Sequence, residues 1–168
     1  MILKAIEDRF SVRKFKNIPI EEDKLNAILK AAQLSPSAKN VQPWKFVVIK
    51  DKQMRDQLPA ICKGQKFVSQ APVTIAVCCN NLGYIMTCGQ KTASVDGAIV
   101  GAHITLQAVE LGLGSCWIGA FYQDKMAKLI NLPDEFEVIA LFPIGYPDIE
   151  KGKRNLKSIS EIVVYDRF

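Results

Sequence analysis

Two clusters of basic side chains lie near opposite ends of the sequence. The first, Arg9-Phe10-Ser11-Val12-Arg13, places two guanidinium groups and a hydroxyl within five residues. The second is Lys151-Gly152-Lys153-Arg154. Arginine binds phosphate through two parallel hydrogen bonds and stays charged at physiological pH. Each cluster could therefore hold a phosphate group, although a solvated basic surface would have the same composition.

A third segment, Ser-Pro-Ser-Ala-Lys-Asn-Val-Gln-Pro-Trp at residues 35–44, combines small residues, amides and prolines. It offers backbone N–H groups and the side-chain amides of Asn40 and Gln42, which could bind the edge of a heterocycle. It contains no general base. A purely structural turn would look similar, so both interpretations stay open at this point.

Other kinds of site are absent from the sequence. It contains no GxxxxGK[ST] or GxSxG motif, and Trp117 stands where a dinucleotide fingerprint beginning at Gly112 needs its third glycine. His103 is the only histidine, and the five cysteines form no CxxC pair. We therefore expect no metal site, no disulfide framework and no catalytic triad.

The composition predicts one domain that spans residues 1–168. The chain is 49% hydrophobic and 23% charged, which excludes a disordered protein, and its net charge is +5. No apolar run has the length of a membrane span or signal peptide, so we expect a cytoplasmic protein that binds no membrane. The basic clusters lack interleaved aromatic residues, which argues against nucleic acid. Residues 9–16 and 151–157 each carry four basic and no acidic residues, so the excess charge is local.

The order of the predicted elements favours an α+β fold. Apolar spacing predicts a helix that begins near Glu21 and ends before Ser35-Pro36. Further predicted helices cover residues 52–58, 94–111 and 123–130, and predicted strands cover 46–49, 73–79, 115–117, 137–142 and 162–165. In the longest helix, one predicted core face consists of Val95, Ile99, Ala102, Leu106 and Val109.

Taken together, the segments resemble the nitroreductase family of FMN flavoproteins. The resemblance covers residues 9–15, 35–46, the Gly-Leu-Gly-Ser-Cys-Trp-Ile-Gly run at 112–119, and Lys153-Arg154, in the family's order and spacing. It implies a nitroreductase-like α+β fold with a central, mostly antiparallel sheet flanked by helices. It also implies a homodimer that exchanges terminal segments and binds FMN at its interface.

The resemblance also assigns roles to residues of this sequence. Arg9, Ser11 and Arg13 would hold the phosphate and ribityl chain, with backbone contact from Phe10, and Lys153 and Arg154 would complete the phosphate site. The ring would meet Trp117, Ile118, Gly119 and Ala120 of one subunit, with Gln65 or Lys66 reaching the ring or ribityl chain. The second subunit would contribute Pro36, Ser37, Ala38, Asn40 and Gln42.

The implied reaction needs no catalytic side chain, because the flavin carries the hydride. The backbone N–H of Gly119 or Ala120 would approach flavin N5. NAD(P)H would reduce FMN and leave, and a small nitroaromatic or quinone-like acceptor would then take the electrons in a ping-pong cycle. The sequence contains no fingerprint that selects NADH or NADPH.

The sequence departs from the family pattern in two places. Longer members carry a helical insertion that helps cover the active site, whereas the corresponding segment here, residues 80–92, is short. Gly119 replaces an acid that some members place near N5. Tyr84 and Phe121 are candidate pocket walls or ordinary packing residues. The short segment keeps an alternative open, a flavin carrier or electron relay without its own small substrate; a basic nucleic-acid adaptor is a third hypothesis.

Overall fold

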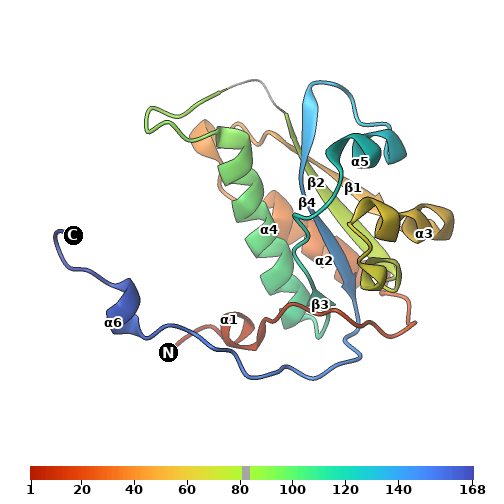
Figure 1. The fold of residues 1–168 in the computed structure, drawn as a ribbon, viewed down its shortest axis with the longest axis horizontal. Coiled ribbons are helices and arrows are strands. Elements are labelled where there is room, and N and C mark those ends of the chain that lie inside the picture. Colours follow the sequence, from red (N-terminus) through yellow and green to blue (C-terminus); the bar gives the residue numbers. More distant parts are fainter. Residues whose placement is uncertain (81–83) are drawn as a thin grey trace.

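The computed structural model describes residues 1–80 and 84–168 (Figure 1). Three residues of the short 80–92 segment, 81–83, lie outside the described residues. The elements follow in the order α1 (Lys4–Asp8), α2 (Glu22–Gln33), the 3₁₀ turn η1 (Ala38–Asn40), β1 (Trp44–Ile49), α3 (Lys52–Ile61), the 3₁₀ turn η2 (Lys66–Ser69), β2 (Val73–Asn80), α4 (Thr92–Glu110), β3 (Gly114–Ser115), α5 (Gln123–Leu129), β4 (Phe136–Gly145) and α6 (Ile159–Ile162).

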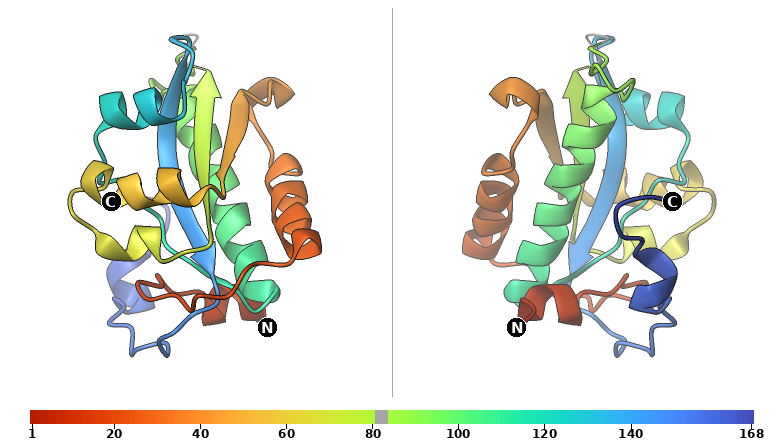
Figure 2. Two further views of the ribbon diagram at one scale, coloured as in Figure 1. Left: turned by 90° about the vertical axis from the view of Figure 1, so that its right-hand side faces the viewer. Right: turned by 90° about the vertical axis from the view of Figure 1, so that its left-hand side faces the viewer.

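One sheet lies at the centre, with the strand order β1-β2-β4-β3. Every pair of neighbouring strands is antiparallel, and β2 pairs along its whole length with β4. Helices α2 and α4 cover one face of the sheet, and α3 and α5 cover the other (Figures 1 and 2). The predicted α+β architecture with a central antiparallel sheet is confirmed.

Strand β2 shows why the core has two halves. All its residues up to Cys79 are buried, because helices cover both faces of the sheet. Side chains alternate along a strand, so Ile75 and Val77 pack with α2 and α4, whereas Ala76 and Cys78 pack with α3 and α5.

The predicted core face of α4 is wrong. The side of the helix that packs on the sheet carries Ala93, Val100, Ile104 and Ala108, together with Gly101. The five residues of the predicted face are instead half-buried or exposed. The helix is apolar on nearly all sides, so periodicity alone could not identify the sheet-facing side. Small residues decide it, because they allow the helix to approach the strands closely.

Two other predicted boundaries need correction. Residues 162–165 form no strand; instead α6 ends at Ile162, and its first turn is closed by a capping box between Ser158 and Glu161. A strand needs a partner, and the described part of this chain offers none there. Helix α3 continues through Pro59 to Ile61 instead of ending before the proline.

Backbone pairing joins a segment near the start of the chain to β3 and to the residues that follow β4. The backbone N–H of Val12 donates to the carbonyl oxygen of Ser115 at 3.0 Å, and the N–H of Asp148 donates to the carbonyl oxygen of Lys14 at 2.9 Å. Ser11 also forms a parallel bridge with Ser115. The two basic clusters, far apart in sequence, are thereby carried to the same end of the sheet.

No helix among the described residues is long and apolar enough to cross a membrane. The C-terminal segment, residues 151–168, is exposed throughout and runs away from the sheet (Figure 1).

The burial of the cysteines makes a prediction about their reactivity. Burial raises the pKa of Cys62 and Cys78 to about 11, and burial together with nearby Asp96 raises that of Cys79 to about 12. Cys116 is buried with a raised pKa, and only Cys88 of the five free thiols is exposed.

Because the thiolate is the reactive form, we expect one fast-reacting thiol per native chain with an aromatic disulfide reagent at pH 8. All five should react after unfolding, and Cys88→Ser should remove the fast phase; a second fast thiol in the native protein would contradict the core described above.

Candidate functional site

The half-buried Arg9 guanidinium is the first element of the site. Its burial lowers the pKa of Arg9, and the positive charge of Arg154 lowers it further. The described residues form five ion pairs, and none includes Arg9, Arg13 or Arg154. The fold thus brings two like charges from opposite ends of the sequence together without an acidic partner in the described part of the chain.

Ser11 and Arg13 reach the same region from the paired N-terminal segment. Burial raises the pKa of Cys116, and the charge of Arg13 and a contact with the Ser11 hydroxyl partly offset that shift. Ser115, beside them, has a buried hydroxyl oxygen with no hydrogen-bond partner among the described residues. Three donors predicted from one motif, Arg9, Ser11 and Arg13, therefore gather around Ser115 and Cys116.

Phe10 and Lys153, also predicted for the phosphate site, differ in burial. Phe10 is half-buried and packs against the small cluster of Val12, Phe15 and Ala71. Lys153 is exposed and forms no ion pair among the described residues. The exposed lysine two residues earlier, Lys151, donates to the carbonyl oxygen of Glu7 and ties the C-terminal segment to α1.

The segment Trp117–Ala120 continues along the edge of β4. Ile118 exchanges two backbone hydrogen bonds with Leu141, at 2.9 and 3.1 Å. Trp117 is 40% exposed, and its ring meets Phe142 edge to face with centroids 4.9 Å apart. A Cβ on Gly101 would lie 2.3 Å from the Trp117 ring, so this glycine makes room for the indole.

The backbone next to this tryptophan offers unused donors. In the described part of the chain, the N–H groups of Gly119 and Ala120 donate to no protein oxygen. The carbonyl oxygen of Ala120 accepts a hydrogen bond of 3.4 Å from the side-chain amide of Gln65. The structure therefore brings Gln65, which was predicted to reach the ring, to the Trp117–Ala120 segment.

The Pro36–Gln42 loop has an unusual backbone. Lys39, Asn40 and Gln42 have φ values of 52°, 55° and 53°, in the left-handed region that side chains make costly. The N–H of Gln42 donates to the Ser37 hydroxyl oxygen at 2.9 Å, which closes the loop. Such strain concentrates at functional sites, where the surrounding structure enforces it.

Asp96 anchors this loop, and the sequence reasoning missed it. Its side chain is 2% exposed, and its two oxygens accept the Ala38 N–H at 3.2 and 3.3 Å. The carboxylate lies near the N-terminus of α4, where the helix dipole favours negative charge. An aspartate inside an otherwise apolar helix was the signal that could have identified it.

The two groups of predicted ring-binding residues do not meet within one chain. The Pro36–Gln42 loop leads into β1, at one edge of the sheet, whereas Trp117–Ala120 follows β3 and pairs with β4, beyond β2. The phosphate cluster lies on the β3 and β4 side. One chain therefore presents two separate half-sites.

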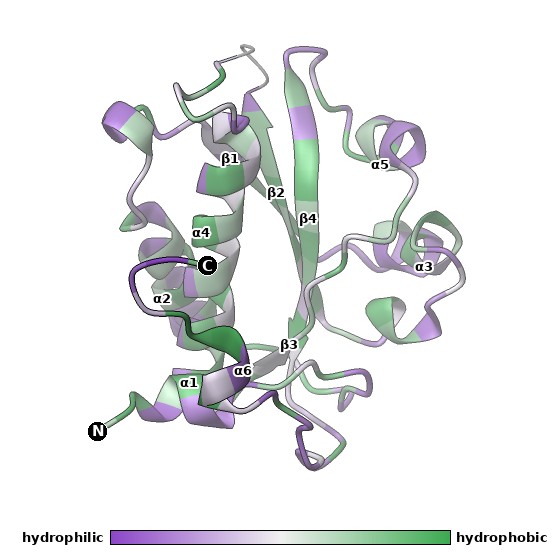
Figure 3. Ribbon diagram, turned by 60° about the vertical axis from the view of Figure 1, so that its left-hand side comes forward, coloured by the Kyte–Doolittle hydropathy of each residue, from purple (hydrophilic) through white to green (hydrophobic). Residues whose placement is uncertain are grey.

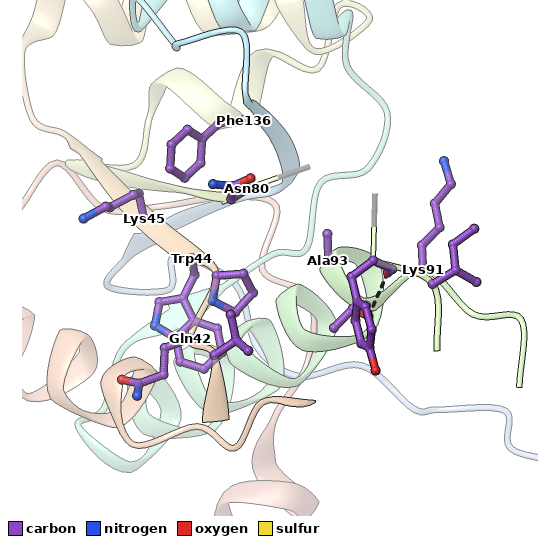
Figure 4. Close-up of a pocket in the computed structure, with 12 residues that line it drawn as sticks. Gln42, Trp44, Lys45, Asn80, Lys91, Ala93 and Phe136 are labelled. Carbon is purple, nitrogen blue, oxygen red and sulfur yellow. Dashed lines mark hydrogen bonds between the residues drawn. The ribbon is translucent and has the colours of Figure 1, made fainter. Parts of the chain in front are cut away.

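A cavity of about 520 Å³ borders the Pro36–Gln42 loop (Figure 4). Trp44 and Phe136 supply aromatic walls, and the buried amide oxygen of Asn80 has no hydrogen-bond partner among the described residues. Tyr84, one of the two predicted pocket walls, lines this cavity. Phe121, the other, packs against the core on the α3 and α5 side instead.

Comparison with known proteins shows the family to which the chain belongs. The model of the Nitroreductase family matches residues 6–66 and 60–146. The chain belongs to the nitroreductase family. A Methanothermobacter thermautotrophicus protein that carries the provisional name NADH dehydrogenase/NAD(P)H nitroreductase is 31% identical over 92% of this chain and 82% of its own length.

Solved structures of nitroreductases share the fold. An FMN-dependent nitroreductase from Clostridium difficile R20291 is 31% identical, with a TM-score of 0.87 over 98% of both chains. A second nitroreductase family protein, from Clostridium difficile 630, is 28% identical, with a TM-score of 0.90 over the whole of both chains. The Bacillus subtilis FMN reductase [NAD(P)H] is 26% identical over 91% of this chain and 68% of its own length.

His103 makes a contact between two helices. The described residues contain no group of three histidine, cysteine or acidic side chains that could hold a metal ion. His103 Nδ1 lies 2.9 Å from the hydroxyl oxygen of buried Ser35, so the histidine joins α4 to the end of α2.

The Asp96 anchor predicts a measurable loss of stability. Asp96→Ala removes the acceptor of the half-buried Ala38 N–H, and a hydrogen bond of this kind contributes about 0.5–1.5 kcal/mol. Asp96→Asn keeps an amide oxygen that can accept the same hydrogen bond and should lose less. Urea unfolding of both variants measures the difference. A midpoint for Asp96→Ala equal to that of the unmodified protein would show that the loop holds its shape without the anchor.

Proposed function

We propose that this chain is an FMN-dependent oxidoreductase that transfers hydride from NAD(P)H through flavin N5 to a small acceptor. The observation that carries the proposal is the convergence of Arg9 and Arg154, with Ser11 and Arg13 beside them, on one end of the sheet. Two guanidinium groups without an acidic partner in the described residues suit a dianionic phosphate. This donor set fits the phosphate of FMN.

The adjoining segment fits the ring of the same cofactor. Trp117 presents an exposed aromatic edge, and the free N–H groups of Gly119 and Ala120 can donate to a ring nitrogen. FMN, when bound, supplies the hydride chemistry. The residues of the chain hold and orient the ring, and their N–H groups favour electron density at the atom they face. Because FMN would supply the hydride chemistry and the chain would supply only binding and orientation, the site needs no general acid or base.

The cavity beside the Pro36–Gln42 loop supports a small planar acceptor. Its size lies within the range of small-molecule pockets, and its walls include Trp44, Phe136 and Pro43. We propose a nitroaromatic or quinone-like compound as the acceptor. Donor and acceptor would use the same exposed face of the ring in turn, in a ping-pong cycle.

A homodimer with FMN at its interface would join the two half-sites. Apolar side chains on the outer face of α4, among them Ile99 and Leu106, are only half-buried in one chain. Helix α6 in the C-terminal segment is coloured largely as hydrophobic in Figure 3. The apolar side chains exposed in this segment are Leu156, Ile159, Ile162, Val163, Val164, Tyr165 and Phe168. Tyr165 is 84% exposed, and a chain of this size rarely leaves so many apolar groups in water. We propose that a second copy covers both surfaces and exchanges terminal segments with the first.

Five unpaired cysteines support a reducing compartment, and we propose the cytoplasm.

The purified protein should be yellow and release FMN when it is denatured. Under anaerobic conditions, NADH or NADPH should bleach the bound flavin, and a nitroaromatic or quinone should restore its colour. Absorbance spectroscopy follows both steps. A protein that stays colourless after incubation with excess FMN would contradict the proposal. Bound flavin that neither nucleotide bleaches would favour a flavin carrier or electron relay.

The phosphate assignment predicts that Arg9→Ala and Arg13→Ala each weaken FMN binding. Arg9 is half-buried and Arg13 is exposed in one chain, and truncating one partner of a hydrogen-bonded charge pair that ligand and partner would bury typically costs about 2–5 kcal/mol. Equilibrium dialysis with FMN measures the loss. Lys16→Ala is the matched control, because Lys16 is exposed and forms no ion pair among the described residues. Equal FMN retention by the Arg9 and Lys16 variants would place the phosphate elsewhere.

The shared site predicts that two inactive variants complement each other. Arg9→Ala damages the phosphate half-site, and Asn40→Ala damages the loop half-site. In a mixed dimer, one of the two sites combines an intact half from each chain. Random pairing of equal amounts should therefore restore about a quarter of the unmodified activity. Denaturing and refolding the two variants together, against each alone, tests this; absence of any recovery in folded mixed dimers would show that each site lies within one chain.

A further inference from the structure

Two lysines converge on one tyrosine ring at the outer end of the Trp117–Ala120 segment. Lys63 Nζ lies 3.6 Å from the centroid of the Tyr122 ring, and Lys125 Nζ lies 4.5 Å from it. Tyr122 itself is 38% exposed. The attraction between an ammonium group and an aromatic face holds both charges at the surface.

The cluster is fixed to the candidate ring site by the backbone. The N–H of Tyr122 donates to the carbonyl oxygen of Ile61 at 3.0 Å, which joins the end of α3 to the start of α5. Lys63 follows with a left-handed φ of 57°, and Gln65 then reaches Ala120. The lysines therefore keep a defined position beside Ala120, whose free N–H belongs to the ring half-site.

The charge of this cluster is not neutralised by the chain. Neither Lys63 nor Lys125 belongs to any of the five ion pairs in residues 1–80 and 84–168. Asp124 is adjacent in sequence but forms no ion pair with either lysine within these residues. Both ammonium groups lie against one ring without a carboxylate partner among these residues, and an anion bound beside the ring would offset their positive charge.

We propose that Lys63, Tyr122 and Lys125 form a binding site for phosphate groups of the nicotinamide dinucleotide donor. This inference rests on the proposed function, since it assumes a nicotinamide stacked on the flavin. The nicotinamide occupies only one end of the donor, so the diphosphate and the adenosine end extend past the ring toward its surroundings. The cluster supplies positive charge at the surface next to Ala120, where that part of the donor leaves the site.

Single and double alanine variants of Lys63 and Lys125 test the site against three hydride donors. NADH and NADPH share the diphosphate, NADPH adds a 2′-phosphate, and 1-benzyl-1,4-dihydronicotinamide carries no phosphate. Each single variant should raise the KM for a phosphate-bearing donor on the order of fivefold, with kcat unchanged, because exposed charge pairs contribute modestly. The KM for the benzyl compound should stay the same. Lys128→Ala, on the same helix and without contact to the Tyr122 ring, is the control.

The three donors separate the two sources of phosphate. A rise for NADH and NADPH alike assigns the cluster to the diphosphate, and a rise for NADPH alone assigns it to the 2′-phosphate. An equal rise for the benzyl compound, or a loss of kcat, would show that the lysines act on the flavin or the hydride step and would overturn the inference. Unchanged KM values for both dinucleotides in the double variant would overturn it as well.

A binding measurement separates this inference from the proposed function. ADP-ribose carries the diphosphate but no nicotinamide, and calorimetric titration needs no turnover. We expect binding by the unmodified protein that weakens with added salt and is lost in the Lys63→Ala/Lys125→Ala variant. If FMN is bound and bleached normally while ADP-ribose binds both proteins equally, this inference alone fails. If FMN is not bound at all, the proposed function fails first.

Discussion

The backbone pairing that brings half-buried Arg9 near Arg154 is the constraint on which the candidate site depends. The pairing of the N-terminal segment with Ser115 and with the chain after β4 forces these two charges together, and no described carboxylate relieves them. Folding alone would not favour such an arrangement, because like charges in a partly buried setting raise the free energy of the folded state. A bound phosphate, as proposed, would reverse the sign of that contribution and would couple ligand binding to the stability of this end of the sheet.

The apolar outer face of α4 is a second feature that one chain leaves only half-buried. Helix α4 uses its small residues to approach the sheet, and this leaves Ile99 and Leu106 facing outward, half-buried. The strained Pro36–Gln42 loop, held by Asp96, adjoins α4 but lies at the other edge of the sheet from Trp117. A partner that covers the outer face of α4 would therefore also bring a loop of this kind toward the opposite half-site. One association would bury apolar area and complete the binding site together.

Features recorded in local sequence were predictable, and those set by packing were not. The strands and the long helices follow from apolar periodicity, and the basic cluster of Arg9 and Arg13 follows from a short motif. The sheet-facing side of α4 could not be predicted, because the helix is apolar on nearly all sides and steric fit at Gly97 and Gly101 selects the side. At residues 162–165, β-branched composition indicated a strand, whereas the Ser158–Glu161 capping box winds the preceding residues into α6. Asp96 and the lysines around Tyr122 acquire their roles only from contacts distant in sequence.

Gly119 connects the chemistry of the site to its selectivity. A Cβ at this position would meet nothing closer than Trp117 Nε1, at 3.9 Å, so packing does not require a glycine. Its small size leaves the backbone N–H accessible and leaves the rim of the ring half-site open. Because Gly119 supplies neither an acid nor a close-fitting wall, residues farther from the ring would have to discriminate between ligands. With the proposed function, the charged Lys63–Tyr122–Lys125 cluster and the aromatic cavity beside the loop would supply opposite kinds of selectivity, one for phosphate and one for apolar rings. Alternating use of one exposed ring by a charged donor and an apolar acceptor calls for that combination.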